Sequence, residues 1–251
     1  MRILLLSDIH SNLDALEGCL AAAPACDLVV NLGDVVGYGA NPNEVIERSR
    51  SLGKHFVRGN HDKAAAGLMD LREFNPIAGM ASLWTREQLS RENLEWLRGL
   101  PQGPLRIPEL PQAQFVHGSP IHEDDYVVTA RDALEPLMAT SIPLTFFGHS
   151  HVQGAFSSNP AETGGLRPVY KTVGQKETTE MQLREGVEYL INPGSVGQPR
   201  DGDWRAAFAV FDVNEYRVSF CRVPYDLKRA QDRILAANLP QKLATRLATG
   251  R

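Results

Sequence analysis

The stretch Arg2-Ile3-Leu4-Leu5-Leu6-Ser7-Asp8-Ile9-His10 is the part of the chain from which the fold can be worked out. Its apolar run predicts a short buried β-strand that ends where Ser7 and Asp8 begin. A helical pattern follows, which we expect Ser11 to cap with Asp14 as its capping-box partner. A second apolar run at 28–32 then ends at Gly33-Asp34. Strand, helix and strand in this order predict a βα unit.

The same pattern continues along the chain. Asn41-Pro42 followed by Glu44 is a helix start signal, and the run at 55–57 predicts a third strand that leads into Gly59-Asn60. Consecutive βα units predict a largely parallel sheet with right-handed crossovers. Because ligands of such sheets bind at the carboxyl ends of the strands, the polar residues that follow each strand should gather at one edge.

The second half of the chain has a different character. We expect helices over 64–100, with starts at Asn75-Pro76 and Ser90, and strands at 115–116 and 144–147 with a helix at 129–138 between them. Further strands, mainly antiparallel, are predicted at 169–173, 187–191, 206–213 and 216–223. The polar residues 174–186 are expected to form a surface loop or hairpin flap, and Asp226 is expected to cap a terminal helix. We therefore expect a single domain over 1–251 in which 225–251 is a C-terminal helical extension.

Composition limits the function classes. The formal net charge is −4, so no global positive field attracts nucleic acid or an anionic membrane surface. The three cysteines form no Cys-x-x-Cys pair, which favours small thiols in a reducing compartment. No apolar stretch approaches the length of a membrane span or a signal-peptide core. These features together predict a cytoplasmic protein.

Histidines and acidic residues follow the predicted strands at short spacings. Asp8 and His10 are two residues apart, as are His149 and His151, so in extended backbone both members of a pair point the same way. Gly33 and the glycine before Asn60 allow a sharp turn beside them. A single such pair is more often a satisfied polar cluster, but the whole set predicts a site for two metal ions. Mixed nitrogen and oxygen ligands suit Mn, Fe, Zn, Ni or Co better than Mg or Ca.

Five of these segments, taken in order, resemble the signature of the calcineurin-like metallophosphoesterases. They are Asp8-Ile9-His10, Gly33-Asp34, Gly59-Asn60-His61-Asp62, Val116-His117-Gly118 and Gly148-His149-Ser150-His151. The turns at 37–43 and 192–200 are similar to the small prokaryotic branch, which includes phosphodiesterases and diadenosine tetraphosphatases. The resemblance implies an α/β fold with an α+β-like second half, a four-layer αββα sandwich of two mixed sheets.

The resemblance also implies roles for particular residues. The first ion would take Asp8, His10, Asp34 and His151, and the second would take Asp34, Asn60, His117 and His149. Asp34 would bridge the two ions, His61 would be the general acid, and Asp62 would hold the His61 ring in orientation. Arg200 is either a guanidinium that reaches a substrate phosphate or one half of a loop salt bridge with Asp201 or Asp203. Tyr38 and Asn41 are candidates for the pocket lining, although Asn41 is also a suitable helix cap.

The predicted activity is therefore hydrolysis of small phosphodiesters or dinucleoside polyphosphates by a hydroxide that bridges two divalent ions, with manganese favoured. A phosphomonoesterase or a Ser/Thr protein phosphatase would use the same metal core, and both remain alternatives. A non-catalytic binding module of this fold would be expected to have lost ligands or His61, and all are present. We expect a small phosphorylated substrate as partner, with no stable nucleic-acid partner and no membrane.

Overall fold

Strand β1 (Arg2–Leu6) lies in the middle of a six-stranded sheet, in the computed structural model that describes residues 1–158 and 163–251. Its neighbours are β2 (Leu28–Asn31), which is parallel to it, and β10 (Ala206–Asp212), which is antiparallel. The sheet continues through β3 (His55–Phe56) beyond β2, and through β11 (Arg217–Val223) and β8 (Glu177–Gln182) beyond β10. The parallel half is the product of the predicted βα units.

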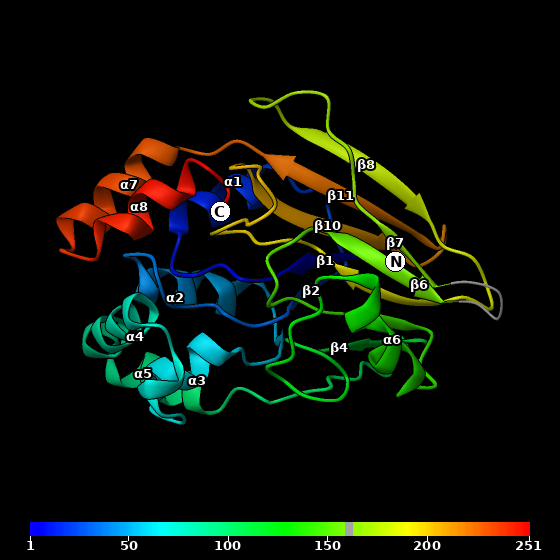
Figure 1. Cartoon of the computed structure of the whole chain (residues 1–251), viewed down its shortest axis with the longest axis horizontal. Helices are drawn as coiled ribbons and strands as arrows, with labels where there is room; N and C mark the ends of the chain where they lie inside the picture. The colour runs from blue at the N-terminus through cyan, green and yellow to red at the C-terminus, as the bar shows by residue number, and fades with distance from the viewer. Residues whose placement is uncertain (159–162) are drawn as a thin grey trace.

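A second sheet of five strands faces the first (Figure 1). Three of its strands are parallel to one another: β4 (Ala113–Phe115), β5 (Leu144–Phe146) and β9 (Glu188–Asn192). Beyond β9, β6 (Gly154–Ser158) pairs antiparallel with β9, and β7 (Thr163–Leu166) pairs antiparallel with β6.

Successive side chains of β1 point to opposite faces of the first sheet, and this shows how the layers pack. Ile3 and Leu5 point into the core between the two sheets, where they meet Phe115 and Phe146 of the second sheet. Leu4 and Leu6 point to the opposite face, which α1 (Leu13–Ala22) and α2 (Pro42–Leu52) cover. The outer face of the second sheet is covered by α6 (Ala130–Met138). The four-layer sandwich of two mixed sheets is confirmed.

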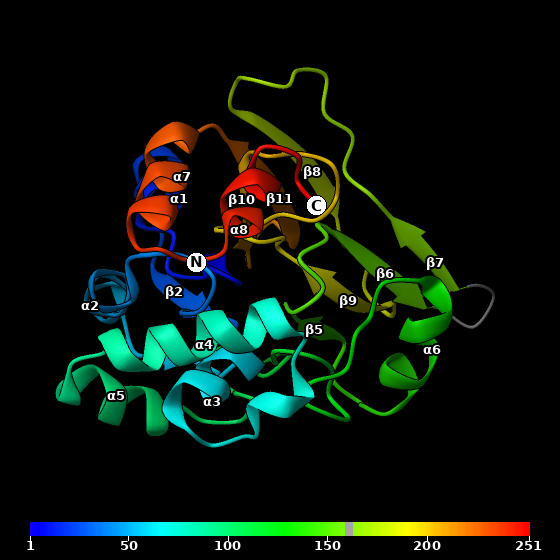
Figure 2. The ribbon, with the colours of Figure 1, turned by 60° about the vertical axis from the view of Figure 1, so that its left-hand side comes forward.

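The remaining helices surround the edge where the parallel strands end. On one side lie α3 (Asn60–Ala66), α4 (Pro76–Gln88) and α5 (Arg91–Arg98), with the short 3-10 turn η1 (Leu71–Glu73). On the other lie α7 (Leu227–Ala236) and α8 (Gln241–Leu247), which face α4 across this edge (Figure 2). No helix among residues 1–158 and 163–251 is long and apolar enough to cross a membrane.

Several local predictions were wrong. The N-cap of α1 is Asn12, whose side chain accepts from the Ala15 N–H at 3.1 Å, and not Ser11. Residues 169–173 form no strand, since Val169 and Val173 are each 80 % exposed and have no sheet to join.

The polar stretch 174–186 contains β8, the edge strand of the first sheet. An edge strand with one solvent face can carry Glu and Thr at alternate positions, so β8 has no apolar run in its sequence. Strands β6 and β7 were missed because they are rich in glycine and serine.

Candidate metal centre

The polar residues that follow the parallel strands meet at one edge of the two sheets. Asp8 and His10 follow β1, Asp34 follows β2, and Asn60 begins α3 directly after the turn from β3. The second sheet contributes His117 after β4, and His149 and His151 after β5. All seven side chains were predicted to meet here. They form two groups that share Asp34.

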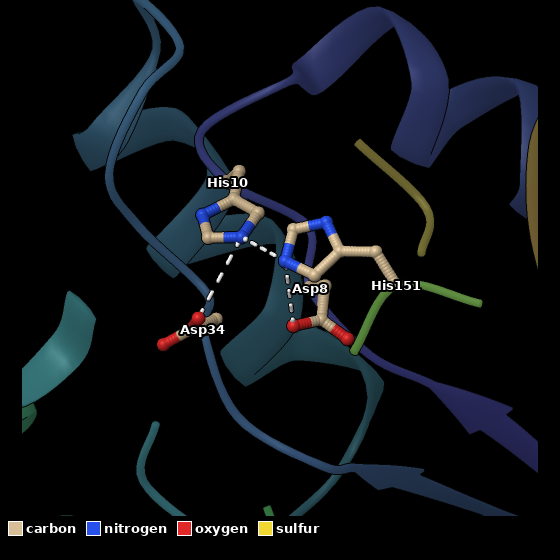
Figure 3. A group of neighbouring side chains, drawn as sticks. All are labelled: Asp8, His10, Asp34 and His151. Atoms are coloured by element: carbon tan, nitrogen blue, oxygen red, sulfur yellow. Dashed lines mark hydrogen bonds and ion pairs between the residues drawn. The ribbon is translucent and has the colours of Figure 1, made fainter. Parts of the chain in front are cut away.

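The first group consists of Asp8, His10, Asp34 and His151 (Figure 3). The His151 Nε2 atom lies 3.3 Å from Asp8 Oδ1, and the His10 Nε2 atom lies 3.6 Å from Asp34 Oδ2. The two Nε2 atoms of His10 and His151 are 3.1 Å apart. The four ligand atoms thus converge on one small volume, as a metal site requires.

The second group is built around the same carboxylate. The His117 Nε2 atom lies 3.5 Å from Asp34 Oδ2 and 3.1 Å from His149 Nδ1. Asn60 Oδ1 is 3.4 Å from His117 Nε2, so the amide oxygen faces the same volume. Asp34 is therefore placed to contribute to both groups.

The orientation of three imidazoles is set by main-chain carbonyls. The Nδ1 atoms of His10, His117 and His151 lie 3.1, 2.7 and 2.6 Å from the carbonyl oxygens of Val36, Leu32 and Gln198. A carbonyl only accepts, so each Nδ1 carries a proton and the Nε2 atom faces the cluster, where it offers a lone pair whenever the ring is neutral. Two lone pairs 3.1 Å apart repel each other unless a cation lies between them. This arrangement fits divalent metal ions.

The carboxylates carry oxygens that the protein leaves free. Asp8 Oδ2 accepts from the Ser7 hydroxyl at 2.6 Å and from the His149 N–H at 3.2 Å, whereas Asp8 Oδ1 is buried with no hydrogen-bond donor among the described residues. Asp34 Oδ1 accepts from the His61 N–H at 2.8 Å, and Asp34 Oδ2 has no such donor. A buried, unpaired carboxylate oxygen is costly, so each free oxygen is placed to bind a cation.

The backbone beside these ligands is strained. Asp8, His10, Asp34, His149 and His151 all have φ between 50° and 62°, in the left-handed region that non-glycine residues enter at a cost of about 1–2 kcal/mol each. The expectation of extended backbone at the paired ligands is therefore wrong. Strain of this kind concentrates at functional sites, where the surrounding structure holds it in place.

Two glycines allow the close approach. Gly33 has φ 98°, which favours glycine. Gly59 has an ordinary φ of −102°, so its role is not the predicted sharp turn. A Cβ atom there would lie 2.1 Å from Asp34 Oδ1, and only glycine leaves room for that carboxylate.

Burial and mutual repulsion shift the pKa values of these groups. Burial lowers the pKa of His10 and His151 well below the ordinary value, so both rings are neutral at pH 7. Burial, reinforced by the Asp34 charge, raises the pKa of Asp8 to about 7. At His117 burial lowers the pKa, but the Asp34 carboxylate outweighs it and raises the value to about 10. A metal ion would replace that proton, since a ligating imidazole is neutral.

His61 lies beside the first group without belonging to it. Its ring centroid is 4.9 Å from that of His10 and 4.3 Å from that of Tyr38, and its Nδ1 is buried without a hydrogen-bond partner in the described chain. Burial lowers the pKa of His61 to about 4, against the Asp34 charge that raises it.

Asp62 does not hold the His61 ring, contrary to the expectation from the family resemblance. Its carboxylate oxygens accept from the main-chain N–H groups of Gly59 at 3.0 Å and Val36 at 3.2 Å. These bonds cap α3 and join it to the turn that carries Asp34. Asp62 can therefore position His61 only through the main chain.

Arg200 forms no salt bridge within its loop. Asp201 pairs with Arg222 and Asp203 pairs with Arg205, so neither acid beside Arg200 is available to it. The Arg200 Nη2 atom donates to Gln198 Oε1 at 3.2 Å and to the Tyr38 hydroxyl at 3.5 Å. Its guanidinium is thus held next to the metal centre.

Two further residues lie at this edge without any signal in the sequence. The Tyr126 ring lies 3.8 Å from the His149 ring, centroid to centroid, and Arg246 of α8 lies beside Tyr38. Tyr126 follows an acidic loop in which Glu123 accepts from Arg58 at 2.9 Å and pairs with Lys63 at 3.1 Å. No motif marks either residue, because the tertiary fold brings both to the site.

Comparison with known proteins agrees with this geometry. Residues 1–216 match the family model described as the calcineurin-like phosphoesterase superfamily domain. An uncharacterized protein of Methanocaldococcus jannaschii is 38 % identical over 254 residues, covering 99 % of this chain and 98 % of that protein.

Solved structures are also similar. A metallophosphoesterase from Sphaerobacter thermophilus has a TM-score of 0.85 and 41 % identity, covering 100 % of this chain and 99 % of that one. A hypothetical protein from Pyrococcus horikoshii OT3 has a TM-score of 0.77 at 21 % identity, covering 100 % and 98 %, and shows the shared fold. The chain belongs to the calcineurin-like phosphoesterase superfamily. Within it, the chain is a metal-dependent phosphoester hydrolase.

Proposed function

We propose that this hydrolase cleaves small phosphodiesters or dinucleoside polyphosphates with two divalent ions, of which Mn²⁺ is favoured. The observation that carries the proposal is the set of three imidazoles with carbonyl-bound Nδ1 atoms, whose Nε2 atoms face the free oxygens of Asp8 and Asp34. The first ion would be held by Asp8, His10, Asp34 and His151. The second would be held by Asp34, Asn60, His117 and His149.

When bound, two divalent ions would supply positive charge to the phosphoryl oxygens and would acidify a water. The carboxylate of Asp34 faces both groups and would reduce the repulsion between the two cations. Arg200 is placed to bind a phosphoryl oxygen, since its Nε is buried and has no acceptor in the described chain.

We assign His61 to the leaving group. A neutral imidazole can donate one N–H hydrogen bond to the leaving oxygen, and an anionic substrate beside it raises the pKa of the ring so that it can transfer a proton. The Tyr38 ring against His61 excludes water from this side, since Tyr38 is only 6 % exposed. A negative net charge and the absence of a long basic segment favour a small substrate over duplex DNA.

A substrate panel tests the proposal. Metal-stripped protein reconstituted with Mn²⁺ is assayed with bis(p-nitrophenyl) phosphate, p-nitrophenyl phosphate, diadenosine tetraphosphate and duplex DNA. We expect turnover of the diester or the dinucleotide that chelator abolishes, with the monoester slower and the DNA intact. Efficient turnover of the monoester alone, or cleavage of duplex DNA, would contradict the proposed substrate class.

A further inference from the structure

Two arginines from distant parts of the chain lie against one tyrosine ring at the metal centre. The Cζ atoms of Arg200 and Arg246 are 5.8 and 5.9 Å from the centroid of Tyr38. The same ring lies 4.7 Å from the His10 ring and 4.3 Å from the His61 ring, between centroids. Both guanidinium groups are therefore one aromatic ring away from the residues assigned to metal binding and to proton donation.

Neither guanidinium forms an ion pair with a described Asp or Glu side chain, that is, with one in residues 1–158 or 163–251 other than Glu73. Arg246 donates from Nε to the main-chain oxygen of Arg251 at 2.6 Å, which leaves its two terminal nitrogens available. Burial and then repulsion by Arg200 lower the pKa of Arg246. The oxygen of Arg251, the last residue of the chain, already accepts from the Arg246 Nε, whereas neither cation has an ion pair to a described Asp or Glu side chain. Two neighbouring guanidinium cations in this arrangement would be stabilised by a further anion.

Arg246 and Tyr38 line a pocket of about 580 Å³, to which residues of α8 and of the start of α4 also contribute. Its lining includes Tyr38 and three cationic side chains, those of Lys242, Arg246 and Arg251, and it includes no Asp or Glu side chain among the described residues. Its volume lies in the range of small-ligand sites. The positive charge is local, because the whole chain has a net charge of −4.

We propose that Arg200 and Arg246, which both lie near the Tyr38 ring, form an anion subsite. This subsite would bind a phosphate that is linked to the phosphate being hydrolysed. The preferred substrates are then compounds with two or more linked phosphate groups, rather than simple diesters. This proposal rests on the proposed function, since it takes the metal centre as the site of the scissile phosphate. It also gives the C-terminal helix α8 a role in specificity.

The chemistry of the subsite favours phosphate over other anions. A guanidinium presents paired N–H donors that match two phosphate oxygens, and two such groups can neutralise the charge of a polyphosphate chain. A simple diester has one phosphate, which the metal centre would take, and it offers no second phosphate to the terminal nitrogens of Arg246. Arg246 is therefore the residue that separates the two substrate classes.

The test compares Arg246→Gln with wild type and with Arg184→Gln, a matched loss of charge at an exposed arginine in the loop after β8. With Mn²⁺ present, we expect Arg246→Gln to lower the ratio of kcat/KM for diadenosine tetraphosphate to that for bis(p-nitrophenyl) phosphate by about tenfold or more, mainly through KM. Arg246→Lys, which keeps the charge, should restore part of the ratio. An unchanged ratio in Arg246→Gln would overturn the proposal.

A second readout does not depend on turnover. Titration calorimetry of metal-stripped protein with tripolyphosphate should show binding that weakens by about tenfold in Arg246→Gln and not in Arg184→Gln. No binding to the wild type, or equal binding to the Arg246 variant, would refute the subsite. If neither substrate is hydrolysed, the proposed function fails, while this titration still decides whether the subsite exists.

Discussion

Replacing Asp34 with asparagine tests the shared carboxylate. Asp34 Oδ2 lies 3.6 Å from His10 Nε2 and 3.5 Å from His117 Nε2, so it faces both metal groups. Asparagine keeps the shape and still offers an oxygen to the His61 N–H, which Asp34 Oδ1 accepts at 2.8 Å. It removes the negative charge, and with the oxygen kept on the His61 N–H it places an NH₂ donor where the free Oδ2 lay. The variant should fold and lose at least one ion.

The loss of activity follows from the lost charge stabilisation. Metal ions contribute several kcal/mol to the transition state, and a loss of about 4 kcal/mol corresponds to roughly 10³-fold in rate. The assay is metal content by mass spectrometry after dialysis against Mn²⁺, together with kcat/KM for bis(p-nitrophenyl) phosphate. Asp212→Asn, at the far end of the first sheet in an exposed ion pair with Arg2, is the control and should keep both ions. Two ions and normal turnover in Asp34→Asn would refute the bridging role.

Three further outcomes are expected. His61→Ala should keep both metals and lose about 10²–10⁴ in rate with a poor leaving group but less with nitrophenolate; equal losses would rule out proton donation. Gly59→Ala should lower the melting temperature and metal content, because the new Cβ would lie 2.1 Å from Asp34 Oδ1; a stable variant with full metal would contradict this. At Glu123 burial raises the pKa, but its two cationic partners outweigh it and hold the pKa below the ordinary 4.5. The wild type should therefore melt at a higher temperature than Glu123→Gln above pH 4.5, and this difference should shrink as the pH falls below 4.5. A difference that grows in acid would contradict the lowered pKa of Glu123.

The sequence was most informative where local pattern and tertiary position agree. Buried parallel strands such as β1 and β2 appear as apolar runs, because both of their faces are covered. The polar residues that follow them could be placed at one edge of the sheet by topology alone. The family resemblance adds the ligand roles of the seven residues, which stay predictions, and the fold brings all seven side chains to this edge.

Other features could not be read from the chain. Strand β8 looks polar because it is an edge strand, and β7 looks like a turn because of Gly164 and Gly165. The bond from the Val36 N–H to Asp62 depends on how the 33–36 turn packs against α3, which no local pattern encodes. Arg246 reaches the site only because α8 packs beside Tyr38. Side chains that meet through such long-range packing leave no periodic signal in the sequence.

The most direct test of the two-ion centre is anomalous diffraction at the manganese edge from crystals grown with Mn²⁺. We predict two peaks, one among Asp8, His10, Asp34 and His151 and the other among Asp34, Asn60, His117 and His149. Both ions should contact Asp34, and His10, His117 and His151 should each ligate through Nε2, because their Nδ1 atoms donate to main-chain carbonyls. A single peak, or ions that do not contact Asp34, would contradict the account.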